Sequence, residues 1–134
     1  MNQPMNHPMT AYDFAVLRVV PHVHLGEFVP VGVLLHARQA GFMALLALTS
    51  ETTLRDRLPG VDTGLLARYL RAMERVASGD VQGGPVALAP TSERFHWLTA
   101  PRSDVLQSSP VHEGVCEGDP ERMLARLFAQ YVTG

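Results

Sequence analysis

Three apolar segments follow one another between residues 12 and 49, with only a few residues between each and the next. Residues 12–20 mix aromatic and β-branched side chains and are interrupted only by Asp13 and Arg18, which is typical of a strand covered on both faces. Residues 28–37 place an apolar residue at every odd position from 29 to 37, so one face of this strand should point toward a core. Together with residues 42–49, they predict an antiparallel meander.

A proline lies within the second of these segments. Pro30 has no backbone N–H and cannot donate to a neighbouring strand. We therefore expect it at a β-bulge or on the unpaired side of the strand.

Helices are expected in the second half of the chain. Residues 50–58 and 63–78 have Ser50 and Asp62 or Thr63 as their capping residues. Ser92 should cap a brief helix that runs to residue 98, and residues 103–115 then predict a fourth strand containing Pro110. The connection at 79–90 offers only residues 86–89 as a short strand.

The last helix has the clearest signal. Asp119 is an N-cap residue followed by a proline at the first helical position. Apolar side chains then recur at helical spacing, namely Met123, Leu124, Leu127, Phe128 and Tyr131. This stripe should pack on the sheet.

The predicted fold class is α+β, with an antiparallel sheet of about four strands and helices packed on one face. A chain of 134 residues can bury one hydrophobic core, whereas two would each be undersized. We expect a single domain over residues 11–134, preceded by a flexible leader at residues 1–10.

Composition excludes several classes of protein. Cys116 is the only cysteine, so no intramolecular disulfide can form, and a cytoplasmic location is expected. The chain contains no lysine, which excludes Schiff-base catalysis and the lysine-containing phosphate loop. No apolar run is long enough to span a bilayer. The net charge of −2 gives no general attraction to nucleic acid, and we interpret Arg68, Arg71 and Arg75 as a solvated helix face.

The densest polar segment suggests a ligand site. Arg102 and Ser103 offer a guanidinium and a hydroxyl that could bind a phosphate or carboxylate. Gln107 and His112 are the nearest supporting residues in sequence, and Glu27 could join them if the two loops meet. The alternative is structural, with Arg102 paired to a neighbouring carboxylate and Ser103 capping a turn.

Metal and nucleophile sites are weaker hypotheses. His22, His24, His112 and Cys116 are potential zinc donors, but they lie in separate segments and have no metal-binding signature. Cys116 or one of the serines Ser108 and Ser109 could pair with His112 as a nucleophile and base, although no nucleophile elbow is present. We therefore assign no catalytic residue and expect no metal or cofactor.

Three stretches are individual enough to compare with a known family. They are YDFAVLRVVP at residues 12–21, GEFVPVGVLL at 26–35 and RFHWLTAPRSDVLQSSPVHEG at 94–114. In these stretches the chain resembles a bacterial family numbered three thousand and thirty-seven among the domains of unknown function, over residues 12–132. The resemblance implies no reaction, but it implies genomic proximity to kinases of the HipA-like type and hence such a kinase as partner.

Two hypotheses about function follow. The first is a non-catalytic cytoplasmic interaction or accessory module. The second is a small enzyme or binding protein for a phosphate- or carboxylate-bearing ligand, which would use Arg102, Ser103, Gln107, His112 and Glu27. A deep polar pocket uniting these side chains would favour the second, and an exposed apolar patch would favour the first.

Overall fold

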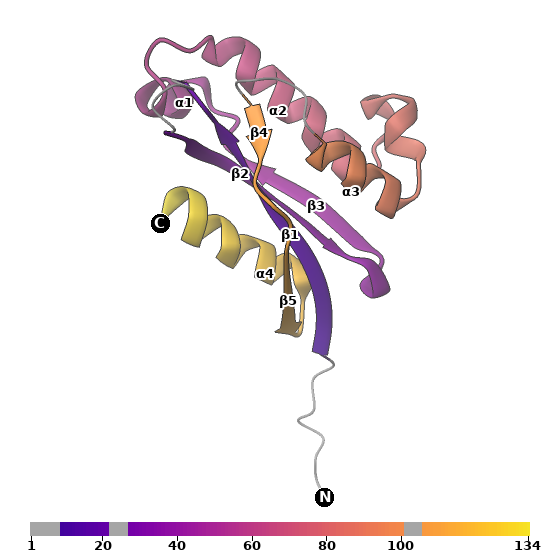
Figure 1. Cartoon of the computed structure of the whole chain (residues 1–134). Coiled ribbons are helices and arrows are strands. Elements are labelled where there is room, and N and C mark those ends of the chain that lie inside the picture. The colour runs from indigo at the N-terminus through magenta and orange to yellow at the C-terminus, as the bar shows by residue number, and fades with distance from the viewer. Residues whose placement is uncertain (1–8, 22–26, 101–105) are drawn as a thin grey trace, which may run out of the picture.

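A computed structural model describes residues 9–21, 27–100 and 106–134 (Figure 1). Its centre is an antiparallel sheet with five strands: β1 (Met9–Val19), β2 (Val29–Ala37), β3 (Phe42–Ala47), β4 (Leu106–Ser108) and β5 (His112–Glu117). The spatial order is β3-β2-β1-β4, and β5 also pairs with β1. This confirms the α+β class and the meander of the first three strands. Strand β1 starts inside the segment that the sequence assigned to the leader, since Met9 pairs with Glu117.

Four α-helices accompany the sheet: α1 (Glu51–Arg57), α2 (Thr63–Ser78), α3 (Thr91–Thr99) and α4 (Pro120–Phe128). Short helical turns complete the described chain: η2 (Arg38–Ala40), η3 (Val81–Gly83), η4 (Pro85–Leu88) and the π-helical η5 (Ala129–Thr133). Ser50, Asp62 and Asp119 cap α1, α2 and α4 through their side-chain oxygens, as predicted. None of the helices in the described ranges is long and apolar enough to cross a membrane.

Two local predictions need correction. Residues 86–89 do not form a strand, because Pro85 begins the 3-10 turn η4 directly after Gly84, whose φ is +87°. Ser92 lies inside α3 and does not cap it. The helix begins one residue earlier, since the carbonyl of Pro90 accepts the first helical hydrogen bond from the backbone of Arg94.

The predicted fourth strand is divided in two at Pro110. The backbone N–H of Ser109 donates to the carbonyl of Val16 over 2.8 Å, and the Ser109 hydroxyl accepts from the Val16 N–H over 2.9 Å. Pairing with β1 then resumes with its register shifted by one residue, from Leu17 opposite Ser108 to Phe14 opposite His112. The sheet therefore has five strands where about four were expected.

A β-bulge in β2 changes which face its side chains occupy. Leu17 pairs with Gly32 and Arg18 with Pro30, so Val31 has no partner on β1. This confirms that Pro30 lies at a bulge. The odd positions of β2 consequently do not share one face: Val31 belongs to the core cluster beneath α2, and Val33 belongs to the cluster beneath α4.

The helices cover both faces of the sheet, which corrects the expected one-face arrangement (Figure 1). Leu17 and Val19 pack with α1, α2 and α3, whereas Phe14 and Val16 pack with α4 and η5. The first two strands bury side chains on both sides, and such strands need a covering layer on each face. As predicted, the apolar stripe of α4 packs on the sheet, with Leu127 only 4% exposed.

Candidate functional site

The described ligand residues that the sequence predicts do not form one cluster. Arg102 and Ser103 fall outside the described residues. Gln107 lies in β4 opposite Arg18 of β1, and His112 lies in β5 opposite Phe14. Arg18 and Phe14 are four positions apart on β1, which corresponds to about 13 Å along an extended strand. The structure thus does not bring Gln107 and His112 together.

Gln107 and His112 nevertheless lie on the same face of the sheet. Simple alternation would place an odd and an even residue on opposite faces, but the register shift at Pro110 cancels this difference. The ring of His112 lies 5.2 Å from that of Phe14, measured between centroids. Glu27 is exposed and precedes Phe28, which contacts Arg18. Glu27 and Gln107 therefore share one end of the sheet, and His112 lies farther along it.

The candidate nucleophiles Cys116, Ser108 and Ser109 are buried or hydrogen-bonded to the backbone. Cys116 is buried in the core beneath α4 and lies four residues along the strand from His112, or about 13 Å. The hydroxyls of Ser108 and Ser109 donate to the carbonyls of Ser109 and Pro110. His22 and His24 lie outside the described residues. Over the ranges 9–21, 27–100 and 106–134, no three His, Cys, Asp or Glu residues are placed to hold a metal ion.

Arg18 is a candidate functional residue that is not among the ligand residues predicted from the sequence. It lies near the end of the inner strand β1, between Pro30 of β2 and Gln107 of β4, on the face that α4 covers. Its side chain is only partly exposed, and its guanidinium carbon lies 4.2 Å from the centre of the Phe28 ring. Its Nε atom is buried and makes no hydrogen bond. The signal in the sequence was a cation interrupting an apolar strand.

The polar residue His36 is buried on the opposite face, where it is 4% exposed. Its Nε2 atom lies 2.9 Å from the hydroxyl of Thr91, and its ring lies 5.4 Å from that of Phe95, so α3 covers it. Burial lowers the pKa of His36, the Asp13 carboxylate acts in the opposite direction, and Arg38 and Arg94 lower the pKa further. This histidine is therefore neutral in the folded protein near pH 7.

We expect acid to weaken the fold through His36. Because its pKa is lower in the folded than in the unfolded chain, the unfolded chain binds the proton first as the pH falls below about 6.5. Its contribution to stability is present above that pH and is lost as the pH falls through the folded-state pKa. Urea unfolding between pH 7.5 and 5 should show the loss in the wild type and a smaller one in His36→Gln, whose amide can still reach Thr91.

The matched control for this prediction is His96→Gln. His96 is an exposed histidine on α3, so its replacement should keep the wild-type dependence on pH. Burial raises the pKa of Glu74, so its contribution to the free energy of unfolding increases as the pH falls, opposite to that of His36. This contribution is the same in all three proteins and cancels in the comparison. Equal pH dependence in the wild type and His36→Gln would contradict the prediction.

One region of the sheet extends beyond its covering helix. Strands β1 and β5 continue past α3 toward the start of β1 (Figure 1). We call this region the open sheet surface and define it by six residues that pair across the two strands on one face: Met9, Ala11, Asp13, Glu113, Val115 and Glu117. Met9 is 63% and Val115 is 58% exposed, which is unusual for apolar side chains so close to a core.

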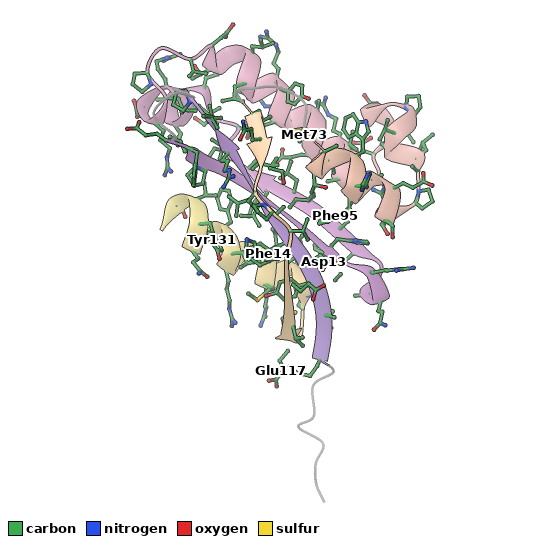
Figure 2. All side chains as sticks on the ribbon, viewed as in Figure 1. Asp13, Phe14, Met73, Phe95, Glu117 and Tyr131 are labelled. Carbon is green, nitrogen blue, oxygen red and sulfur yellow. The ribbon has the colours of Figure 1, made fainter. Side chains whose placement is uncertain are left out.

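The open sheet surface is acidic and hollowed. Figure 2 labels Asp13 near Phe95 of α3, and Glu117 at the far end of the surface. Three of its six residues carry carboxylates. Arginines border it at both ends, with Arg38 near Asp13 and Glu113, and Arg122 and Arg126 near Met9 and Glu117. A hollow of about 390 Å³ lies between Asp13, His36, Arg38 and Glu113. Its chemistry suits a basic segment with apolar side chains better than it suits an anion.

The arginines of α2 have a structural role at one position. Arg71 donates to the backbone carbonyl of Thr49 over 2.8 Å, which ties α2 to the end of β3. Arg71 and Arg75 also border a hollow of about 380 Å³ that they share with Glu74. A carboxylate between the cations weakens their attraction for nucleic-acid phosphates.

Comparison with known proteins gives one clear match. Residues 14–132 match the family described as "Protein of unknown function (DUF3037)". No curated protein and no solved structure shows a significant match to the chain. The family match covers all five strands except the first part of β1, and it includes α1, α2, α3 and α4. The chain therefore belongs to the DUF3037 family.

Proposed function

We propose that the protein is a non-catalytic interaction module of the bacterial cytoplasm that binds a partner protein through the open sheet surface. The observation that carries this proposal is the exposure of Val115 between Glu113 and Glu117 on β5. Val115 pairs with the exposed Ala11 and lies on the same face as the exposed Met9, so these apolar side chains lie together. A contiguous exposed apolar patch rimmed by polar residues marks a site for protein contacts.

The edge of β5 supplies the backbone groups for such a contact. Within the described ranges, β5 pairs with β1 and with no other strand. Its second edge can therefore accept a strand from another protein through main-chain hydrogen bonds. An added strand would place its side chains opposite Glu113, Val115 and Glu117 on the open face.

The glutamates of β5 indicate whether its free edge binds a second copy of this chain or a different protein. In an antiparallel pair of β5 strands centred on Val115, Glu113 of each copy would face Glu117 of the other. Like charges directly opposite destabilise a strand pair, and charges on an edge strand protect it from self-association. The fitting occupant is an extended segment in which Arg or Lys faces the glutamates and an apolar residue faces Val115.

We propose a HipA-like kinase as the protein that carries this segment, with the open sheet surface as the contact on this side. The genomic proximity that the sequence resemblance implies supports this choice of partner. Complementary charge raises the association rate and excludes partners of the wrong sign. Binding should therefore weaken as the salt concentration rises.

Titration calorimetry with a HipA-like kinase from the same organism tests the proposal. We expect binding that is at least tenfold weaker in the double variant Glu113→Lys/Glu117→Lys. Both side chains are exposed, so the substitutions should leave the fold intact. The matched control is Asp56→Lys/Glu93→Lys, which changes the net charge equally at exposed sites on α1 and α3 and should bind like the wild type.

A peptide tests the surface without the kinase. Every second residue of this peptide is threonine, and the residues between the threonines are arginine, valine and arginine in that order. The control peptide has glutamate in place of each arginine. Only the arginine peptide should shift the amide NMR signals of β5, and only in proteins that retain Glu113 and Glu117. Peptide binding without kinase binding would reject the kinase as partner. Loss of kinase binding in both double variants alike would reject the open sheet surface.

A further inference from the structure

We infer that Arg18 forms an anion-binding site for a phosphate or carboxylate group at the end of the sheet away from the open sheet surface. This inference does not depend on the proposed partner contact. It follows from the surroundings of one side chain, which differ from those of the other arginines in the described chain.

Arg18 is held in place but not neutralised. It lies on the central strand β1, and its guanidinium stacks on the ring of Phe28 with 4.2 Å between the guanidinium carbon and the ring centre. The contact restrains the plane of the guanidinium. Between described residues the structure has a single ion pair, Arg55 with Glu51, so no described carboxylate pairs with Arg18.

The buried Nε atom is the second observation. Nε of Arg18 is shielded from solvent and has no hydrogen-bond acceptor. A buried donor without an acceptor costs free energy, and more so when it belongs to a charged group. This burial keeps the charged group poorly solvated on one side. An oxyanion that accepts hydrogen bonds from the two terminal nitrogens would compensate the charge, and the planar fork of arginine suits a two-oxygen group such as phosphate or carboxylate.

The backbone around Arg18 is irregular in a way that favours a site. The residue opposite it on β2 is Pro30, at the bulge that leaves Val31 unpaired. Bulges are frequent beside functional sites, where they redirect side chains. Gln107, opposite Arg18 on β4, places an amide on the same face. Glu27 is an exposed carboxylate next to Phe28, and it opposes anion binding by its charge.

Three variants separate a binding role from a structural one. Arg18→Met keeps an unbranched side chain against Phe28 and removes the unpartnered donor, so it should melt no lower than the wild type. It should bind inorganic phosphate at least tenfold more weakly. Glu27→Gln should bind phosphate more tightly, because it removes a repelling charge. Arg68→Met removes an exposed arginine from α2 and should leave binding unchanged.

NMR titration of the full-length wild-type protein provides the direct measurement. Inorganic phosphate and sodium acetate are added in separate titrations at constant ionic strength, and sodium chloride is the reference. The Nε–H signal of Arg18 should shift saturably with phosphate, acetate or both. The anion with the higher affinity identifies the ligand class. This signal is read in the wild type, so the test holds even if Arg18→Met fails to fold. An Arg18 signal that moves with neither anion, or equal phosphate affinity in Arg18→Met, overturns the proposal.

Discussion

Replacing Leu127 with alanine is expected to lower the free energy of unfolding by about 2–5 kcal/mol. Leu127 is 4% exposed and lies in the core cluster between α4 and the sheet, together with Phe14 and Leu35. The substitution removes three carbon atoms from a packed interior and leaves a cavity that the rigid sheet cannot close. Because α4 is the main helix on this face, its loss of packing should affect the whole domain.

Urea unfolding followed by circular dichroism measures this effect. The matched control is Leu65→Ala, which removes the same atoms from a leucine on α2 that is 55% exposed. The control should change stability by no more than about 0.5 kcal/mol. Equal destabilisation by both substitutions would show that the packing of α4 on the sheet does not set the stability of this face.

Replacing Gly114 with alanine is expected to cost about 1–3 kcal/mol, because it forces a buried ring out of place. Gly114 pairs with Tyr12, and a Cβ atom at Gly114 would lie 2.5 Å from both Cζ and the hydroxyl of Tyr12. Tyr12 is 8% exposed, and its ring centre lies 6.0 Å from that of Phe14. The ring can therefore move away only by disturbing the core beneath α4.

The control for Gly114→Ala is Gly64→Ala in α2. The atoms nearest to a Cβ atom at Gly64 belong to the carboxylate of Glu51, at 3.6 Å, which is an ordinary contact distance. Alanine is favoured over glycine in helices by up to about 1 kcal/mol, so this variant should be as stable as the wild type or more stable. The variant Tyr12→Leu should reduce the cost of Gly114→Ala, since residues in contact are not additive. If Gly114→Ala costs the same in both backgrounds, the clash with Tyr12 is not its cause.

The candidate sites were only partly predictable from the sequence. Arg18 and Asp13 were visible as charges in an apolar strand, but their roles depend on neighbours from β2, β4 and β5. The stacking of Arg18 on Phe28 joins residues that are ten positions apart in the chain. The open sheet surface combines the start of β1 with β5, more than 100 residues later. Such pairings depend on strand register, which short-range sequence patterns do not specify.

The sequence by itself determined the fold class and the starts of three helices. Ser50, Asp62 and Asp119 each bond to a backbone N–H two or three residues ahead, so their effect is local. The apolar stripe of α4 likewise follows from helical periodicity alone.

Only the tertiary structure decided how the faces of the sheet are used. The bulge at Val31 moves part of β2 to the other face, and the break at Pro110 shifts the register of β5 by one residue. Side chains alternate along a strand, so a change of one residue reverses every face assignment beyond it. Each irregularity depends on pairing with β1, which directly precedes β2 in the chain but lies more than 90 residues before β5. The placement of α4 opposite the other helices depends on the same nonlocal contacts, because both faces of β1 and β2 must be covered.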